Sequence, residues 1–401
     1  MAFWLKNIKT ETHYVYTDNW ATGTATEHIA ILIDQGKFQK IVPMTQWTAP
    51  TDRPVVDGQG QLLLPGIIEK HCHFDKSKLG TPWRPVTPAQ TIEARFESEI
   101  PELDALDLPI ETRAQNLIDL EQAHGVVVFR SHVDIEPATG LRYFDAIQQK
   151  VQKDGLQAEL VAFPQHGLLR SNAVSLIEQA LAKGAQYIGG VDPYTLDGDY
   201  QKSLATTFAL AKKYHAGIDI HIHNRDAAGR QTFWELVRLT EIHKMQDQVY
   251  LSHGYGLNDL DHEERQALFS KMAALKIHVV SNIPLEPNRL PPLDELQAAG
   301  VKVHLGCDNI NDAWSSLGDG AITEKLARYL EIYRITTQEG LSQALGLITD
   351  GITPLDQTGQ QVWPKVNDAA NFILTPASCA AEFVARKGAV QQSYALGQRI
   401  K

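Results

Sequence analysis

The sequence predicts an α/β fold in which a (β/α)₈ barrel is accompanied by a small β-sandwich domain built from both termini. Eight apolar runs of strand length alternate with segments of helical periodicity over about 250 residues, as such a barrel requires. The first 60 residues and the tail instead have the pattern of short strands separated by turns. We expect residues 1–60 and 360–401 to form the small domain and residues 61–359 to form the barrel.

The composition excludes several classes of function. The chain has 401 residues, with 37 Lys and Arg against 48 Asp and Glu, which gives a formal charge of −11. Nucleic-acid binding depends on basic side chains that neutralise phosphates, so we expect no nucleic-acid partner. No apolar run approaches the roughly 20 residues of a membrane helix, and no signal-peptide pattern is visible, so we expect no membrane partner. Three cysteines are too few for a disulfide framework, which favours a cytoplasmic location.

The two ends of the chain carry strand signals. Residues 29–33 and 38–42 flank the turn sequence Asp-Gln-Gly-Lys and predict a hairpin. Near the other end, residues 371–374 and 382–385 have strand character, with a turn at 387–388. The simplest arrangement pairs these segments in one small domain.

The middle of the chain alternates between strand and helix signals. The expected barrel strands are residues 62–68, 126–129, 160–163, 185–189, 218–222, 249–252, 277–281 and 301–305. Helical spacing of apolar residues is clear at 203–214, 233–243 and 264–275, and beyond the barrel at 322–333 and 339–348. Glycines at 155, 184, 217 and 300 mark expected helix ends. A doubly wound open sheet also alternates in this way, so the count alone leaves both architectures open.

Polar residues gather where the predicted strands end. Side chains two apart on a strand point the same way, so His71 and His73 share one side at the end of the first barrel strand. His221 and His223 repeat this arrangement on the fifth strand. The second strand ends with His132 and Asp134. The ends of the third, fourth, sixth and eighth strands carry Gln165, Asp192, His253, and the pair Asp308 and Asn309, respectively. The carboxyl ends of barrel strands are where active sites are built.

Imidazole and carboxylate groups that converge on one point bind a borderline divalent ion, most readily zinc, although iron and manganese also suit these ligands. Such an ion acidifies a bound water near neutral pH. Taken singly, a His-x-His pair occurs often by chance, Lys76 reads as a solvated loop charge and Trp314 as a packing residue. Their conjunction at the ends of different strands is what indicates a site.

These motifs resemble the amidohydrolase superfamily, and within it the cytosine-deaminase-like branch. The resemblance rests on Leu-Pro-Gly at 64–66, His-Cys-His at 71–73, and the segments 129–134 and 161–165, followed by His221, His253 and Gly-Cys-Asp at 306–308. A closer likeness, carried by residues 73–77, 189–193, 221–223 and 308–309 with Trp314, is to aminohydrolases that remove an alkylamine from a hydroxylated triazine ring.

The resemblance implies a role for each of these residues. His71, His73, His221 and Asp308 would bind one metal ion, and His253, Asp308 and Lys76 would act in catalysis. A substrate pocket for a small heterocycle would be lined by Gln165, Asp192, His223, Asn309 and Trp314. Members of the family often form homo-oligomers. The bridging lysine of its binuclear members has no counterpart at the fourth strand, where Asp192 stands, which favours a single ion.

One position departs from cytosine deaminase. The glutamate that shuttles a proton there, three residues after the fifth-strand histidine, is replaced by Asn224, and an amide cannot exchange protons near neutral pH. From the resemblance as a whole we predict hydrolytic removal of an amino or alkylamino group from a small pyrimidine- or triazine-like ring. Hydrolysis of a cyclic amide or an N-acyl group, and a metal-binding relative that has lost catalysis, stay open as alternatives.

Overall fold

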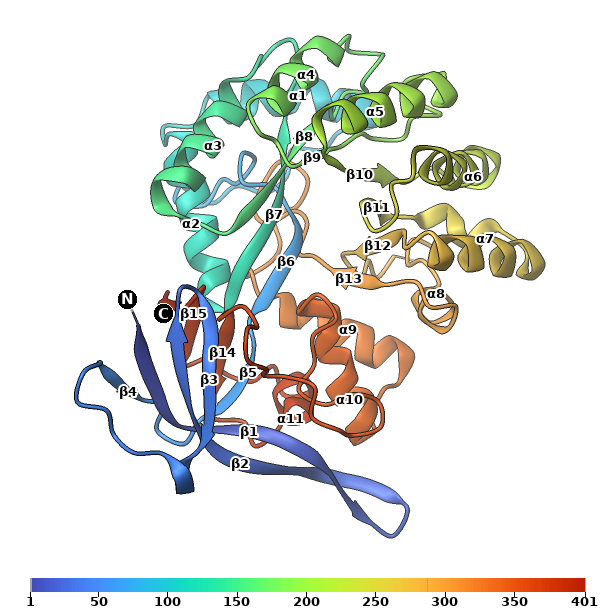
Figure 1. Cartoon of the computed structure of the whole chain (residues 1–401). Coiled ribbons are helices and arrows are strands. Elements are labelled where there is room, and N and C mark those ends of the chain that lie inside the picture. Colours follow the sequence, from blue (N-terminus) through green and yellow to red (C-terminus); the bar gives the residue numbers. More distant parts are fainter. Residues whose placement is uncertain (1, 287, 401) are drawn as a thin grey trace. The chain divides into compact units, whose positions relative to one another are not determined.

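The structure, a computed structural model, describes residues 2–286 and 288–400 (Figure 1). It divides into two compact units. One comprises Met1–Glu69, Asp119–Val128 and Ala321–Lys401, and the other comprises Lys70–Ile118 and Phe129–Gly320.

Eight parallel strands form the predicted barrel. They are β6 (Ile67–Cys72), β7 (Val126–Asp134), β8 (Ala158–Phe163), β9 (Tyr187–Ile188), β10 (Gly217–Ile222), β11 (Val249–His253), β12 (His278–Ser281) and β13 (Val303–Leu305). Hydrogen bonds join them in that order. A parallel bridge between Cys72 and Asp308 then joins the end of β6 to the residues after β13, so the sheet is almost closed. The structure thus confirms the barrel rather than an open sheet.

Helices follow most of the barrel strands. They are α1 (Ile92–Asp104), α2 (Ile110–Ala123), α3 (Arg142–Asp154), α4 (Val174–Ala182), α5 (Tyr200–Tyr214), α6 (Asp226–His243), α7 (His262–Ala274) and α8 (Leu293–Ala298), with a 3₁₀ turn η2 (Tyr255–Asp259). Thr91, Asp199 and Asp261 begin α1, α5 and α7, since each side chain accepts an N–H from the third residue beyond it. Gly155 ends α3 in the left-handed conformation that favours glycine.

The two ends of the chain form a mixed sheet. Its strands run in the order β16 (Gln398–Arg399), β15 (Gln392–Ala395), β14 (Phe372–Thr375), β5 (Leu62–Pro65), β1 (Phe3–Thr17), β2 (Trp20–Asp34) and β3 (Lys37–Pro43), while β4 (Val55–Asp57) also pairs with β1. The predicted hairpin is present, because Gln35 and Gly36 turn the chain between β2 and β3 with positive φ angles.

Alternation along these strands builds a hydrophobic core on one face of the sheet. Ile29, Ile31 and Ile33, two residues apart on β2, pack in one cluster with Phe38 and Phe372. The same unit contains α9 (Ile322–Tyr333), α10 (Gln338–Ala344) and α11 (Ala380–Ala385), together with the 3₁₀ turns η1 (Met44–Gln46) and η3 (Leu345–Ile348).

The segment predicted as the first barrel strand, residues 62–68, is divided between the two sheets. β5 ends at Pro65 in the mixed sheet, and β6 begins at Ile67 in the barrel. Proline has no N–H to continue a ladder. The backbone at Gly66 passes so close to β7 that a Cβ there would lie 2.4 Å from Val127 Cγ2. The chain therefore changes sheets at this pair.

Two further predictions were wrong. Residues 382–385 lie in α11 rather than in a strand, because the Cys379 side chain caps a helical turn by accepting the N–H of Glu382. Gly217 does not end α5. His215 takes the left-handed conformation there, and Gly217 begins β10, where a Cβ would lie 2.2 Å from the Tyr187 ring.

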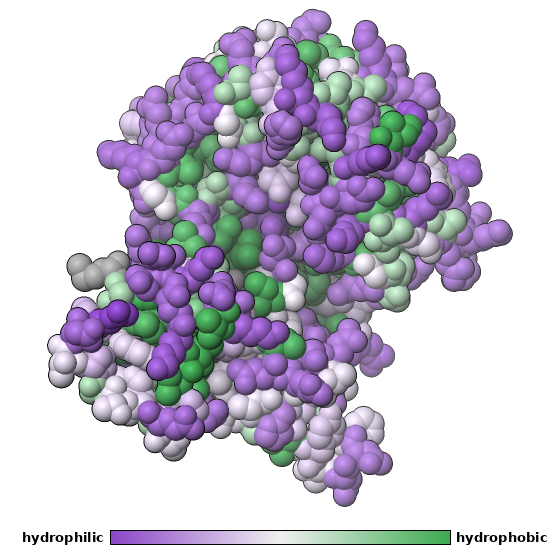
Figure 2. Space-filling model, in the orientation of Figure 1, coloured by the Kyte–Doolittle hydropathy of each residue, from purple (hydrophilic) through white to green (hydrophobic). Residues whose placement is uncertain are grey.

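The face shown in Figure 2 is mainly hydrophilic, with hydrophobic residues in separate patches. Among the described residues, none of the helices combines the length and the apolar character that a membrane crossing requires.

Candidate metal centre and substrate cavity

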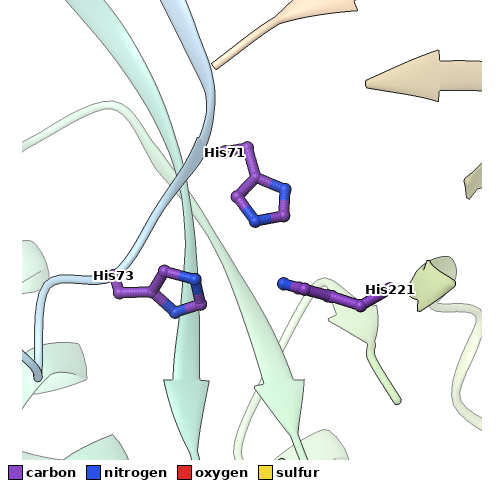
Figure 3. A group of neighbouring side chains, drawn as sticks. All are labelled: His71, His73 and His221. Atoms are coloured by element: carbon purple, nitrogen blue, oxygen red, sulfur yellow. The ribbon is translucent and has the colours of Figure 1, made fainter. Parts of the chain in front are cut away.

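Three imidazoles from two strands point toward one another at the carboxyl ends of the barrel strands (Figure 3). His71 lies on β6, His73 is the first residue after that strand, and His221 lies on β10. The His71 ring centroid lies 5.5 Å from that of His73 and 4.5 Å from that of His221. One ring nitrogen from each residue lies within 4.8 Å of the other two. The alternation along β6 thus brings both of its histidines to one point, as predicted.

Asp308 brings a carboxylate to the same point. It lies three residues after the end of β13, with a φ of 63° that few non-glycine residues adopt, and its N–H donates to the carbonyl of His71. Its Oδ1 lies 3.5 Å from His71 Nε2 and 3.4 Å from His73 Nε2. Asn282 donates to Oδ2 and Asn309 donates to Oδ1, which fixes the orientation of the carboxylate. Burial opposes its ionisation, but hydrogen bonds from His71 and His73 outweigh burial and hold the pKa of Asp308 well below its usual range.

The chemistry of these groups fits a divalent ion. Neither ring nitrogen of His221, nor Nδ1 of His73, has a hydrogen-bond partner among the described residues, although these atoms are buried. Buried polar atoms are normally hydrogen-bonded, so such atoms indicate a ligand. Burial lowers the pKa of His73 to about 4 and that of His221 well below its usual value, so both rings are neutral near pH 7. Neutral imidazole is the form that binds a metal.

A second layer of polar residues orients His71. Its Nδ1 lies 3.0 Å from Ser252 Oγ, which donates to Asp219 Oδ1 at 2.7 Å. Arg130 Nη1 in turn lies 3.1 Å from Asp219 Oδ2. Such contacts fix which ring nitrogen of a ligating histidine faces the ion.

His132 also belongs to this cluster, although the ligand set implied by the resemblance does not include it. Its ring centroid lies 4.4 Å from that of His71 and 4.6 Å from that of His221, and its Nε2 lies 3.5 Å from Asp219 Oδ1. Burial lowers the pKa of His132 to about 3. The signal in the sequence is the alternation of Arg130, His132 and Asp134 along β7.

A cavity of about 710 Å³ opens beside the cluster. Its volume lies within the range of small-molecule sites. The predicted site residues that line it are His73, Gln165, His221, His223, His253, Asp308, Asn309 and Trp314. His253 ends β11 with a φ of 71°, and its ring centroid lies 5.1 Å from that of His71 and 4.9 Å from that of His221. The structure thus brings most of the predicted site residues to one cavity.

Asp192 and Lys76 are not among the residues that line this cavity. Asp192 Oδ1 accepts the backbone N–H groups of His223 and Asn224, and its Oδ2 lies 2.9 Å from His223 Nδ1. Asp192 therefore holds His223 in place. The Asn224 amide donates to Thr195 Oγ1. Among the described residues that line the cavity, Asp308 is the only carboxylate.

Lys76 lies in a buried network behind Gln165. Its Nζ donates to Asp134 Oδ2 at 2.8 Å, to Gln165 Oε1 at 2.6 Å and to Glu99 Oε2 at 3.1 Å. Burial lowers the pKa of Lys76, but the charges of Asp134 and Glu99 outweigh burial and raise it above its usual value. The ammonium group is therefore charged and has three acceptors. Its catalytic role stays a prediction.

Glu99 is a site residue that the sequence reasoning missed. It lies on α1 and joins two predicted pocket residues, since Gln165 Nε2 donates to its Oε2 and Trp314 Nε1 donates to its Oε1 at 2.8 Å. The Gln165 amide also donates to Asp134. Both of its N–H groups are thus used inside the protein, and the remaining lone pair of Oε1 is what Gln165 can offer a ligand.

Comparisons with known proteins agree with this geometry. Residues 111–375 match the model of the amidohydrolase family. The chain is 36% identical over 405 residues to the uncharacterized protein YahJ of Escherichia coli, covering 99% of this chain and 87% of that protein. It is 28% identical over 315 residues to an N-isopropylammelide isopropyl amidohydrolase of a Pseudomonas species, covering 76% of each.

A solved structure extends this likeness to the whole chain. The N-isopropylammelide isopropylaminohydrolase from Burkholderia multivorans superposes with a TM-score of 0.86 at 26% identity, covering 100% of this chain and 98% of that one. The family match, the barrel and the buried histidine cluster agree, and the chain belongs to the amidohydrolase family.

Proposed function

We propose that this chain hydrolytically removes an amino or alkylamino group from a small pyrimidine- or triazine-like heterocycle. The observation that carries the proposal is the convergence of the imidazoles of His71, His73 and His221 with the Asp308 carboxylate beside a cavity of ring-binding size, where His73 and His221 have buried nitrogens without a partner among the described residues. The names of two relatives, both enzymes acting on N-isopropylammelide, support the choice of ring.

In this proposal His71, His73, His221 and Asp308 hold one divalent ion, most readily zinc. When bound, the ion would lower the pKa of a water molecule and so supply a nucleophile near neutral pH. Asn282 and Asn309 keep the Asp308 carboxylate in position through their amide N–H groups. The Ser252 hydroxyl keeps the His71 ring in position through its contact with Nδ1.

We assign proton transfer to His253. It lines the cavity, its ring lies beside those of His71 and His221, and Asp308 is the only carboxylate among the described lining residues. With an amide at 224, His253 and Asp308 would accept the proton from the attacking water, and the His253 imidazole would deliver a proton to the leaving nitrogen. Tyr255 helps to orient the ring, since its hydroxyl lies 3.4 Å from His253 Nδ1.

The ring itself would be held by Gln165, Asn309 and Trp314. Gln165 Oε1 can accept from a ring N–H, and Lys76 and Glu99 hold that amide in one orientation. The Trp314 indole, fixed by its bond to Glu99, can cover one face of a planar ring. His223 lies on the cavity wall and is positioned by Asp192. Its ring centroid lies 4.4 Å from that of His253.

Hydrolysis of a cyclic amide is the second candidate. The absence of a further carboxylate among the described cavity-lining residues favours it, because expulsion of a nitrogen from a carbonyl needs no proton shuttle to a ring nitrogen.

Product analysis by mass spectrometry tests both proposals. Zinc-loaded protein is incubated with cytosine, 5-substituted cytosines, ammelide, N-alkyl ammelides, pterins and cyclic amides, and the Asp308→Ala protein serves as the blank. Release of ammonia or an alkylamine by the parent protein, but not by Asp308→Ala, supports the first proposal. Turnover of the cyclic amides alone would replace it with the second. Silence of the metal-loaded protein across the panel would contradict both.

A further inference from the structure

Three arginines line the substrate cavity, and they differ in what compensates their charge. Arg225 donates from Nε to Asp259 at 2.7 Å and from Nη1 to the carbonyl of Asn288. Arg289 Nη1 lies 2.5 Å from the Glu286 carboxylate. Each of these two guanidinium groups therefore has an acidic partner.

Arg95 is the exception. It lies on the first turn of α1, and only 8% of it is exposed. Its Nη2 donates to the carbonyl of Thr87, while its buried Nη1 has no hydrogen-bond partner among the described residues. Among the described residues, no carboxylate lies within ion-pair distance of Arg95, and Glu99, Glu102 and Asp104 of α1 pair with other side chains. A buried charge without a counter-charge is costly in free energy, so its presence in a ligand cavity calls for an explanation.

The acid on the same face of α1 is already bound elsewhere. Glu99 is one turn further along the helix, and its two oxygens accept from Lys76, Gln165 and Trp314. Neither oxygen of Glu99 lies within ion-pair distance of Arg95, so the guanidinium faces the cavity without an acidic partner among the described residues.

The start of α1 adds to this positive potential. Thr91, the residue that caps α1, and Ile92 also line the cavity. The Thr91 side chain accepts one N–H, that of Ala94. The N-terminal end of a helix carries a partial positive charge from N–H groups without intrahelical partners, and this charge attracts anions. The guanidinium and the helix end therefore favour the same kind of ligand.

We propose that Arg95, together with the start of α1, binds an anionic group on the substrate, so that the enzyme selects acidic heterocycles over neutral ones. The inference rests on the proposed function for placing a ring in this cavity. Either a ring carboxylate or an ionised ring oxygen would meet the requirement, because each accepts hydrogen bonds from a guanidinium. Arg95 would then set specificity, while the histidine cluster carries out the chemistry.

Binding of product-like rings tests the proposal without turnover. Calorimetry measures the Kd of uracil (neutral), orotate (a carboxylated pyrimidine) and barbiturate (an ionised ring) for the zinc-loaded parent protein and for Arg95→Gln. We expect orotate, barbiturate or both to bind the parent protein more tightly than uracil. Arg95→Gln should weaken binding of the favoured anion by about 10- to 100-fold, as expected for loss of a charge-assisted hydrogen bond, and leave the Kd of uracil within about twofold. The favoured ligand identifies which anion Arg95 accepts.

Three controls separate this role from a structural one and from the metal. Arg95→Lys keeps the charge but lacks the planar guanidinium, so its Kd for the favoured anion should lie between those of the parent protein and Arg95→Gln. Arg142→Gln removes a surface arginine that pairs with Asp104 and should change no Kd. Chelator-treated parent protein should still prefer the anion, because the preference comes from Arg95.

Several results would overturn the proposal. They are equal binding of all three rings by the parent protein, a preference that survives Arg95→Gln or vanishes on chelation, and equal loss of uracil and anion binding together with a lowered Tm in both Arg95 variants. A failed turnover panel beside an anion preference that depends on Arg95 would refute the proposed reaction alone.

Discussion

The barrel carries two groups of buried histidines whose ring nitrogens have different surroundings. In the first group, both nitrogens of His221 and one of His73 lack a hydrogen-bond partner among the described residues. In the second group, His278 Nδ1 lies 2.9 Å from His304 Nε2, and His278 Nε2 lies 2.9 Å from Asp247 Oδ1. The rings of His278 and His304 are stacked, and Tyr250 stacks on His278.

The difference separates His278, whose two ring nitrogens both have partners, from His73 and His221, which have buried ring nitrogens without a partner among the described residues. Burial is common to both groups, so burial alone does not indicate function. What differs is position along the strand. His278 is the first residue of β12, whereas His71 and His73 lie at the carboxyl end of β6, where barrel enzymes place their chemistry. Mutations in the two groups should therefore affect different properties of the protein.

The largest effect is expected from Asp308→Ala. Its carboxylate lies within 3.5 Å of the Nε2 atoms of both β6 histidines, so its loss should prevent metal retention and lower turnover of any active substrate by roughly 10³-fold or more. Metal content by plasma mass spectrometry, measured beside turnover, checks this. His278→Phe, from the second group, is the control and should keep a full metal complement. An Asp308→Ala protein that retains both metal and activity would end the ligand assignment.

The positions of the first group, and of Asp308 beside it, could be predicted because they depend on local geometry. Alternation along a strand and the direction of parallel strands place His71, His73, His221 and Asp308 at one end of the barrel without any long-range information. The same reasoning could not distinguish β5 from β6, because both read as one apolar run. The division depends on the close approach of Gly66 to Val127, 61 residues along the chain.

The residues that surround the ring were harder to predict. Glu99 and Arg95 lie on α1, where Ile92, Phe96, Ile100 and Leu103 have helical spacing, but that spacing does not tell what the polar residues of the helix contact. The role of Glu99 emerges only from its contacts with Gln165 and Trp314, which are 66 and 215 residues away along the chain. Helix propensity and spacing carry no information about such pairs, since tertiary packing alone creates them.

His253→Asn should give a smaller loss and sharpen the comparison within the first group. His253 lines the cavity beside the cluster but does not belong to the proposed ligand set. We expect kcat to fall about 10²- to 10⁴-fold, the usual contribution of general acid–base catalysis, while metal content stays unchanged. Steady-state kinetics with metal analysis of the same preparation measures both. Loss of the metal itself would instead make His253 a ligand, and unchanged kcat would remove it from the mechanism.

The smallest effect on activity is expected from His278→Phe. Phenylalanine keeps an aromatic ring beside Tyr250 but removes the contacts of His278 with His304 and Asp247, leaving a buried imidazole nitrogen of His304 without that partner. The free energy of unfolding should fall by about 1–3 kcal/mol, the cost of a buried polar group that loses its hydrogen bond. Denaturant unfolding of the metal-loaded protein measures this fall, and kcat and metal content should match the parent. If His278→Phe instead lowered kcat or metal content while stability held, the two groups would be coupled, and the presence of hydrogen-bond partners would no longer distinguish structural histidines from ligands in this barrel.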